Sequence, residues 1–285
     1  MYIKGFCGAD EEYPYKRNSL KEVQKLKEYI HKALPKQFET IIGNIQKVSY
    51  PARQGATSEV VFLHTDQGKY VCKRSSLPQY KTWLLEEAKV MKELNTNTSL
   101  PIPTFYDYME DEGNSYLLMS MEEGVPLREA LLAVKTNEEQ VKLIQSFGEK
   151  LKKLHETSLP PEWQHQISWL DIQLKKAAYN LQHYEVDGNP QLLDSLLEHK
   201  PRAIPQTLIH GDCTIDNVLV ADNSVETFID LSGVAYGDPR YDVALAIRSF
   251  IYDKSLLNAF YKGYTLLRLS KEEFDYFDGG LYEFF

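Results

Sequence analysis

The sequence contains little cysteine, and its three cysteines are scattered along 285 residues at Cys7, Cys72 and Cys213. A small secreted scaffold held by disulfides needs a far denser set, and a zinc site needs pairs of closely spaced ligands. The cysteine content therefore argues against both, and it is typical of a protein that works in a reducing cytosol.

The sequence also lacks a basic excess and a long hydrophobic run. Its 32 Lys and Arg residues are outnumbered by 41 Asp and Glu residues, which gives a net charge of -9. Because nucleic acid requires a basic surface, this charge argues against a nucleic-acid partner and is compatible with a cationic one. No stretch reaches the roughly 20 apolar residues of a membrane span or resembles a signal peptide, so we expect a soluble cytoplasmic protein.

The N-terminal residues are polar and aromatic without a period, although 43% of the whole chain is hydrophobic. Residues 1–18 are therefore expected to form an arm rather than part of the core. Ser19, followed three residues later by Glu22, forms a capping-box start for an amphipathic helix that runs to Leu34.

The rest of the chain shows two successive patterns. Residues 45–121 contain short segments rich in Val, Tyr and Phe around one helical stretch, residues 82–95, and predict an antiparallel sheet with one internal helix. After Gly124 the apolar residues take helical spacing over long stretches, which predicts a mainly helical second half.

A cluster of polar side chains interrupts two apolar runs near residue 212. The segment HGDCTIDN, residues 210–217, lies between TLI and VLV, and the next apolar run ends in Asp230. Asp212, Asn217 and Asp230 offer the hard oxygen ligands that suit Mg²⁺. With the metal held by the other two, Asp212 is free to orient a substrate hydroxyl and accept its proton. A turn built from Gly, Asp and Asn is the alternative interpretation.

Further features bear on this choice. A phosphoryl-transfer enzyme of the protein-kinase type also needs a lysine on a strand and a glutamate on the next helix. Lys73 ends the strand-like YVCK, and Glu86 or Glu87 lies in the following helical stretch. Upstream, residues 54–58, QGATS, can fold small side chains over phosphates. A turn alone does not predict this order, so the sequence favours a phosphoryl-transfer site.

With these motifs the chain resembles the aminoglycoside phosphotransferase family, which shares the protein-kinase fold, and most closely its 3'-hydroxyl-modifying branch. The resemblance runs from about Gly55 to the C-terminus and rests on GATSEVVFL, YVCKRS, LLEEAKVMKEL, YLLMSMEEGVPL, LIHGDCTIDNVLV and FIDLSGVAYGDPRYDVALAIRSF. It implies an α+β, two-lobed protein-kinase-like fold. The N-lobe, residues 19–121, would hold a five-stranded antiparallel β-sheet with one internal helix, and the C-lobe, residues 122–285, would be mainly helical.

The resemblance also implies a role for each candidate site residue. Asp212 looks like the catalytic aspartate, Asn217 and Asp230 like the metal ligands, and Lys73 with Glu87 like the ion pair that positions the phosphates. The implied cofactors are ATP and Mg²⁺. The other implied nucleotide contacts come from the hinge backbone and the small residues of the upstream loop: Ser120, Glu122, Gly55, Ala56, Thr57 and Ser58.

In the resembling family, acidic residues near the C-terminus help to line the acceptor pocket. Glu283 corresponds to such a position, with Asp275 and Asp278 near it, and Asp171 is a second candidate for contact with a cationic acceptor. A solvated acidic tail is the alternative interpretation of the C-terminal carboxylates.

The remaining motif residues are expected to support the loop. Asp242 looks like the residue that braces the catalytic loop, and His210 and His155 are expected to be structural. Residues 231–233, Leu-Ser-Gly, depart from the Gly-Arg of close relatives, so the contacts of that Arg are not carried over.

The predicted activity is transfer of the γ-phosphoryl group of ATP to a hydroxyl of an aminoglycoside or a related cationic sugar. The same fold also serves kinases of choline, other sugars, fructosamine, homoserine or macrolides, and these acceptors stay open. A nucleotide-binding regulator without catalysis is the alternative from another class of protein. A protein-substrate kinase is not favoured, because no APE-bounded activation segment follows Asp230.

Overall fold

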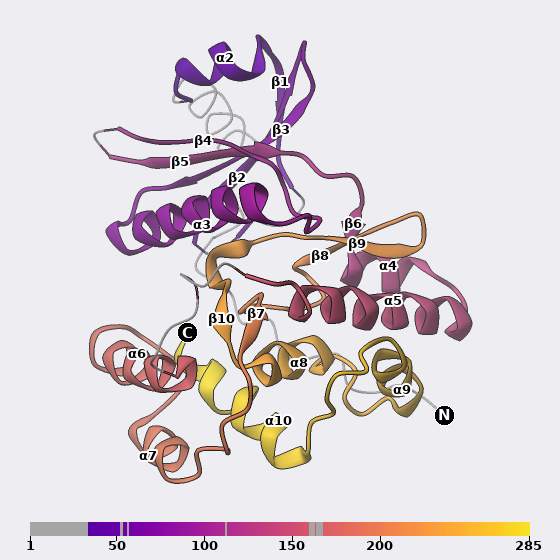
Figure 1. Cartoon of the computed structure of the whole chain (residues 1–285). Helices are drawn as coiled ribbons and strands as arrows, with labels where there is room; N and C mark the ends of the chain where they lie inside the picture. The colour runs from indigo at the N-terminus through magenta and orange to yellow at the C-terminus, as the bar shows by residue number, and fades with distance from the viewer. Residues whose placement is uncertain (1–33, 52–53, 56, 112, 160–162, 164–167) are drawn as a thin grey trace, which may run out of the picture.

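The computed structural model of the chain describes residues 34–51, 54–55, 57–111, 113–159, 163 and 168–285 (Figure 1). The predicted N-terminal arm, and the predicted helix up to its last residue, Leu34, lie outside these ranges. Figure 1 shows a β-sheet at one end of the molecule and a mainly helical body at the other. This architecture confirms the predicted α+β fold.

Five antiparallel strands form the N-terminal sheet: β1 (Ile45–Ser49), β2 (Glu59–Thr65), β3 (Lys69–Ser75), β4 (Phe105–Glu110) and β5 (Ser115–Ser120). Their spatial order is β1-β2-β3-β5-β4, and the five strands agree with the five-stranded sheet that the resemblance implied. The helix α2 (Gln37–Ile42) precedes the sheet, and α3 (Pro78–Asn97) connects β3 to β4. The helix α3 begins four residues before the predicted start, because proline is favoured in the first turn of a helix.

The rest of the described chain is mainly helical, with strands of two to five residues. Its elements are β6 (Val125–Pro126), α4 (Leu127–Ala133), α5 (Asn137–His155), α6 (Trp169–His183), α7 (Pro190–Glu198), β7 (Thr207–Ile209), β8 (Val218–Ala221), β9 (Ser224–Phe228), η2 (Leu231–Gly233), β10 (Ala235–Gly237), α8 (Pro239–Ile247), α9 (Lys254–Gly263), α10 (Lys271–Phe277) and η3 (Leu281–Phe284). The helix α5 begins with a capping box, in which Thr136 and Glu139 bond each other's backbone N–H groups.

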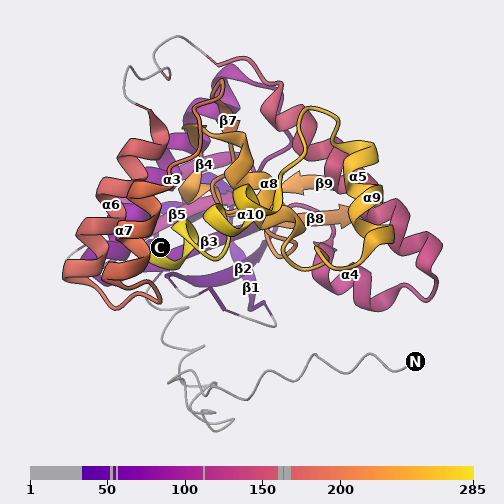
Figure 2. The same cartoon turned by 90° about the horizontal axis from the view of Figure 1, so that it is seen from below.

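Hydrophobic packing joins the sheet to the helical body. Met91 of α3 and Leu117 of β5 are fully buried in the same cluster as Phe147 of α5 and Phe260 of α9. A second cluster packs α6 and α7 against α8 and α10. In the view from below, α6 and α7 lie on one side and α4, α5 and α9 on the other (Figure 2). Among the short strands, β8 contacts α4, β9 contacts α5, β7 contacts α5 and α8, and β10 contacts α6.

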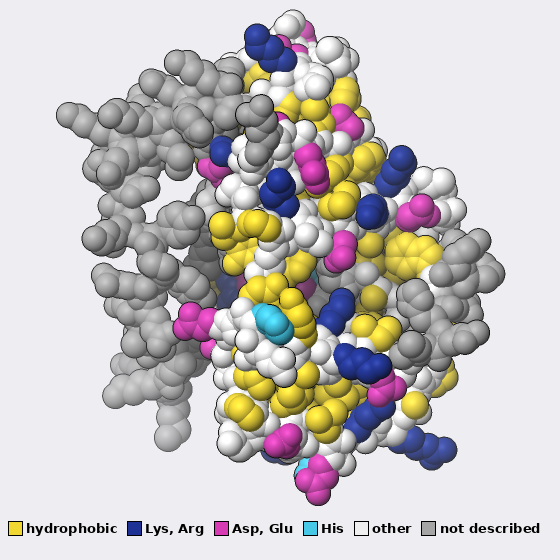
Figure 3. All heavy atoms as spheres, turned by 90° about the vertical axis from the view of Figure 1, so that its left-hand side faces the viewer, with side chains coloured by type: hydrophobic (Ala, Val, Ile, Leu, Met, Phe, Trp, Pro, Cys, Tyr) yellow, Lys and Arg dark blue, Asp and Glu magenta, His cyan; other side chains and the backbone are white. Residues whose placement is uncertain are grey.

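Charges of both signs are mixed with hydrophobic side chains on the face drawn in Figure 3. Exposed aromatic and aliphatic side chains on α6, the turn after it and α7 include Tyr179, Tyr184 and Leu197. Within the described ranges, no helix combines the length and the apolar character that crossing a membrane requires.

Candidate functional site

Strand pairing brings the predicted polar cluster together. Residues 210–217 connect β7 to β8, and Asp230 follows the end of β9 by two residues. The strands β8 and β9 pair with Val218 opposite Phe228, and the N–H of Ile229 donates to the carbonyl of Asn217 at 3.0 Å. Because antiparallel neighbours place the start of one strand beside the end of the other, the 210–217 loop and Asp230 lie at the same edge.

A glycine lets the loop turn at this edge. Gly211 has φ +80°, a left-handed conformation that L side chains rarely adopt, and a Cβ there would clash with the carbonyl of Gly233. The backbone before Asp212 therefore packs directly on the backbone after Asp230.

Replacing Gly211 by alanine is expected to lower the free energy of unfolding by about 3 kcal/mol, because backbone strain and a backbone clash add. Urea unfolding measures the change. Gly113→Ala is the matched control, since a Cβ on Gly113 meets no atom within 4 Å. Equal stabilities of the two variants would contradict the steric account.

The two oxygens of the Asp212 carboxylate differ in their hydrogen bonding. Its Oδ2 accepts a hydrogen bond from Asn217 Nδ2 at 2.7 Å, whereas its Oδ1 is buried and has no partner among the described residues. Burial raises the pKa of Asp212, although the nearby His210 opposes the shift. A carboxylate with a raised pKa and an unpartnered oxygen is suited to accept a proton from a ligand.

Lys73 connects the sheet to this edge. Its Nζ lies 2.7 Å from Glu87 Oε1 and 3.2 Å from Asp230 Oδ1, and Glu87 Oε1 also accepts the N–H of Leu231 at 3.1 Å. Burial disfavours the Lys73 ammonium, but the charges of Asp230 and Glu87 outweigh burial and raise its pKa. The charge of Lys73 in turn holds the pKa of Asp230 low. The lysine is thus fixed as a cation, and its helix partner is Glu87 rather than Glu86.

The backbone of Asp230 is strained. Its φ of 62° and ψ of 74° lie in the left-handed region, which is uncommon for a residue other than glycine. The side chain is 46% exposed although it contacts the buried Lys73. Strain of this kind persists where the surrounding structure holds it, often at functional sites.

Asp242 of α8 holds the first half of the loop. Its Oδ2 accepts the N–H of His210 at 2.6 Å and its Oδ1 accepts the N–H of Gly211 at 2.8 Å. His155 Nε2 also bonds Asp242 Oδ2, at 3.1 Å, and Tyr264 bonds His155 Nδ1 at 2.8 Å. The side chains of Asp242 and His155 are fully buried. Asp242, His155 and His210 therefore have the structural roles that we expected. The series of hydrogen bonds from Tyr264 through His155 and Asp242 to the loop was not predicted.

The upstream loop is held by side-chain bonds to the sheet. Gln54 bonds both backbone groups of Val60, at 2.7 and 2.9 Å, and Ser75 Oγ donates to the carbonyl of Thr57 at 3.0 Å. Ala56, one of the four predicted loop residues, lies outside the described ranges. The described part of the loop leads directly into β2, beside the strand that carries Lys73.

The predicted hinge follows β5. Ser120 donates its N–H to the carbonyl of Thr104 at 2.9 Å, and its hydroxyl donates to the carboxylate of Glu122. The N–H of Glu122 donates to no described residue.

The donor set at the loop edge fits Mg²⁺. The amide nitrogen of Asn217 is used by Asp212, which leaves its side-chain oxygen for a cation, and Asp230 is open to solvent. In the described part of the chain, no three His, Cys, Asp or Glu side chains form a ready metal cluster. Mg²⁺ commonly takes only one or two protein ligands and completes its coordination with water and phosphate oxygens, and Asn217 and Asp230 are the residues that would hold it.

C-terminal side chains lie close to Asp212. Burial and then the charge of Asp212 raise the pKa of Tyr282, and the guanidinium of Arg248 lies 4.5 Å from the centre of the Tyr282 ring. Arg248 Nε is 2.9 Å from Asp278 Oδ1, an ion pair without hydrogen-bond alignment. Burial first, then neighbouring carboxylates including Asp278, raise the pKa of Glu283. Tyr282, whose pKa is raised in part by the charge of Asp212, and Arg248 were not predicted, and the predicted Glu283 follows Tyr282 in η3.

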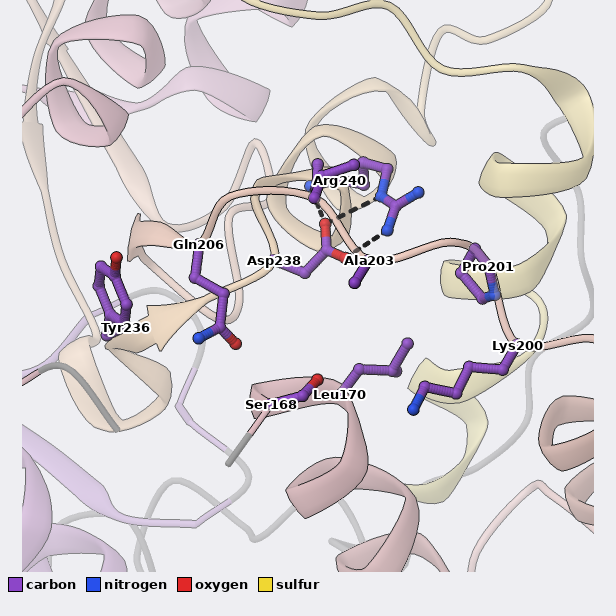
Figure 4. Close-up of a pocket in the computed structure, with 10 residues that line it drawn as sticks. Ser168, Leu170, Lys200, Pro201, Ala203, Gln206, Tyr236, Asp238 and Arg240 are labelled. Carbon is purple, nitrogen blue, oxygen red and sulfur yellow. Dashed lines mark hydrogen bonds and ion pairs between the residues drawn. The ribbon is translucent and has the colours of Figure 1, made fainter. Parts of the chain in front are cut away.

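Asp171 has a different environment. It forms an ion pair with Lys200, beside a pocket of about 400 Å³ (Figure 4). Figure 4 shows Arg240 paired with Asp238 at this pocket, and no residue of the 210–217 loop lines it. The pocket is lined by Ser168, Leu170, Lys200, Pro201, Ala203, Ile204, Gln206, Tyr236, Asp238 and Arg240. The structure therefore does not bring Asp171 together with the other predicted site residues.

Among curated proteins, the aminoglycoside 3'-phosphotransferase of Enterococcus faecalis is 28% identical over 165 residues, 54% of this chain and 61% of that protein. A homoserine kinase of Neisseria meningitidis serogroup B is 35% identical over 92 residues, 30% of each chain. The aminoglycoside 3'-phosphotransferase of Staphylococcus aureus is 26% identical and covers 69% of this chain and 77% of its own. The chain thus matches less than two thirds of the length of the first two relatives.

Solved structures share the fold. An aminoglycoside-3'-phosphotransferase of type VIII superposes with a TM-score of 0.70 at 19% identity, covering 91% of this chain and 99% of its own. A Streptomyces rimosus aminoglycoside phosphotransferase in complex with ADP and streptomycin has a TM-score of 0.62 at 20% identity. This superposition covers 78% of the present chain and 90% of the Streptomyces chain. The protein-kinase-like fold implied by the sequence is thereby confirmed.

The comparison with protein families covers most of the chain. The model of the phosphotransferase enzyme family (APH) matches residues 50–276, a range that includes strands β2 to β5, Lys73, the 210–217 loop and Asp230. The chain belongs to the phosphotransferase enzyme family.

Proposed function

We propose that the protein transfers the γ-phosphoryl group of ATP to a hydroxyl of a small molecule in the presence of Mg²⁺. The observation that carries this proposal is the assembly of Lys73, Glu87 and Asp230 beside Asp212 and Asn217. These residues come from the sheet, from α3 and from two separate loops, and a single turn motif does not produce that assembly.

Asp212 accepts the proton in this proposal. The acceptor hydroxyl donates to the unpartnered Oδ1, the acceptor oxygen forms a bond to the γ-phosphorus, and the bond from phosphorus to the ADP oxygen breaks. The proton ends on Asp212, and ADP leaves. Asn217 keeps the carboxylate oriented through its 2.7 Å bond to Oδ2.

The nucleotide lies between the sheet and the loop. Lys73 presents a fixed cation to the phosphates, and the Glu122 N–H together with the Ser120 carbonyl binds the adenine edge. Asn217 and Asp230 hold Mg²⁺, which when bound neutralises phosphate charge. Catalysis then rests mainly on positioning and on charge neutralisation.

For the acceptor we propose a cationic compound, an aminoglycoside or a related amino sugar. The carboxylates of Asp187, Asp278 and Glu283 lie near one another, and the guanidinium of Arg248 pairs with Asp278. The names of two curated relatives support the same class. Homoserine, an amino acid with a hydroxyl, is the second candidate, because a homoserine kinase shares 35% identity over its matched segment.

Replacing Glu283 by glutamine is expected to raise the KM for a cationic acceptor about tenfold, with little change in kcat or in nucleotide binding, because only a charge contact to the acceptor is lost. ADP release with Mg²⁺ and ATP is the measurement, using kanamycin, neomycin, homoserine and choline. Glu138→Gln is the control, since Glu138 is 78% exposed on α5.

The same assay separates the alternatives. Turnover with homoserine alone would show that the acceptor is not an aminoglycoside and would leave the proposed phosphoryl-transfer mechanism unchanged. Nucleotide binding without turnover on any acceptor would favour the regulator and contradict the proposed function. An unchanged KM in Glu283→Gln would show that Glu283 does not contact the acceptor.

A further inference from the structure

Arg128, at the start of α4, holds two consecutive residues of the 210–217 loop. Its Nε lies 2.6 Å from Asp216 Oδ1 and its Nη2 lies 2.7 Å from Asp216 Oδ2. Its backbone N–H donates to the carbonyl of Ile215 at 3.0 Å. Two parallel bonds from a planar guanidinium fix orientation as well as distance, which a single lysine contact does not. We name this set of three bonds the Arg128 clamp.

The Arg128 clamp acts on the half of the loop that Asp242 does not reach. Asp242 bonds the backbone before Asp212, whereas Asp216 directly precedes Asn217. Asn217 is in turn bonded to the carboxylate and to the backbone carbonyl of Asp212, at 2.7 and 2.9 Å. A shift of Asp216 therefore moves Asn217 first and Asp212 through it.

The Arg128 clamp is also close in sequence to the hinge. Two residues separate Glu122 from β6 and four separate it from α4, and β6 pairs with β8 through Val125 and Val220. Gly124 packs so closely that a Cβ there would lie 2.6 Å from the carbonyl oxygen of Val220. The backbone after the hinge is thus pressed onto the strand that begins at residue 218.

We propose that Arg128 is a positioning residue, which fixes Asn217 and Asp212 and ties their geometry to the segment that holds the adenine. The part of this inference that concerns kcat rests on the proposed function. The inference goes beyond that function because it concerns a side chain to which the proposed function assigns no contact with nucleotide or acceptor, and because its partner Asp216 lies 88 positions away in sequence.

A structural role and a positioning role predict different results. The side chains of Arg128 and Asp216 are 37% and 48% exposed, so the ion pair adds little to stability. Arg128→Lys and Asp216→Asn should therefore melt within about 2 °C of the wild type. Their kcat should fall about 10-fold to 100-fold, because small displacements of catalytic groups are costly.

A binding measurement gives a readout that needs no acceptor. Titration calorimetry of ADP with and without Mg²⁺ reports how strongly the metal enhances nucleotide binding. Since Asn217 is a proposed ligand of that metal, Arg128→Lys should lower the enhancement severalfold and leave metal-free ADP binding unchanged. The reversed pair, Arg128→Asp with Asp216→Arg, should recover part of both losses.

Lys150→Gln is the matched control. Lys150 of α5 forms an ion pair with Glu226 of β9 at 3.0 Å, so this pair also joins two elements that are distant in sequence. The side chain of Glu226 is 48% exposed, like that of Asp216, but neither Lys150 nor Glu226 belongs to the 210–217 loop. This variant should keep wild-type kcat and metal enhancement.

The inference is overturned if Arg128→Lys keeps both the kcat and the Mg²⁺ enhancement of the wild type. It is also overturned if losses appear only with a fall in melting temperature of several degrees, which marks a structural role. If the wild type itself turns over no acceptor, the proposed function fails, and the Mg²⁺ enhancement alone then decides the role of Arg128.

Discussion

Asp212→Asn lowers turnover by about 10³-fold and leaves nucleotide affinity unchanged, if Asp212 accepts the proton of the acceptor hydroxyl. The substitution keeps the shape of the side chain and an oxygen for the amide of Asn217, which bonds Asp212 at 2.7 Å. It removes the carboxylate whose Oδ1 has no partner in the described structure. In the proposed function, nucleotide binding relies on Lys73, the hinge and the metal ligands, so calorimetry with ADP and Mg²⁺ should give wild-type affinity.

The same variant should be at least as stable as the wild type. Burial raises the pKa of Asp212, so its ionised form is less favourable in the folded protein than in the unfolded chain. That cost is present at neutral pH and is relieved as pH falls through the raised pKa. Asparagine removes it, and thermal unfolding at neutral pH should show no loss. The rate of the wild type should fall on acidification through the same pKa, since only the ionised carboxylate accepts a proton.

Two results would contradict this role for Asp212. Turnover of Asp212→Asn within tenfold of the wild type would show that another group accepts the proton. A large loss of stability would show that the carboxylate serves the fold, and any loss of activity would then carry no information about proton transfer.

Asp242→Ala is expected to lower the free energy of unfolding by about 3–5 kcal/mol and to abolish turnover. The substitution leaves the N–H groups of His210 and Gly211 and the ring of His155 without their common acceptor, in a fully buried site. Buried donors without partners carry their full desolvation cost, and the loop before Asp212 loses its anchor. Denaturant unfolding and ADP release measure the two effects.

Tyr264→Phe is the control for Asp242→Ala. It removes one hydroxyl from the same buried network, at His155 Nδ1, and leaves the three bonds to Asp242 in place. A cost of about 1 kcal/mol with turnover largely retained is expected. If Asp242→Ala were no more harmful than Tyr264→Phe, Asp242 would not be the anchor of the loop.

The parts of the site that the sequence predicts are those that short-range patterns determine. The segment around Asp212 reads as a polar loop between two apolar strands, and the structure has β7 and β8 at those positions. Lys73 falls at a strand residue opposite Val60 because alternation and turn residues set the register of β2 and β3. The preference for Glu87 over Glu86 came from the resemblance, and the 2.7 Å contact with Lys73 agrees with it.

The parts that the sequence does not predict depend on contacts between distant segments. Asp171 has the charge of an acceptor ligand, but its position beside Lys200 is set by how α6 packs against the chain after α7. Arg128 and Asp216, 88 positions apart, carry no signal of their pairing in one sequence. The left-handed backbone of Asp230 is equally invisible, because aspartate rarely adopts it unless neighbouring segments impose it.

The most direct test of the account follows the γ-phosphoryl group itself. ATP with a radiolabelled γ-phosphate is incubated with Mg²⁺, a panel of cationic and neutral alcohols, and either the wild type or Asp212→Asn, and the labelled products are separated. The account predicts that label moves to a small-molecule acceptor with the wild type and not with the variant. Label that reaches no acceptor although ATP is bound, or that moves equally with both proteins, would contradict it.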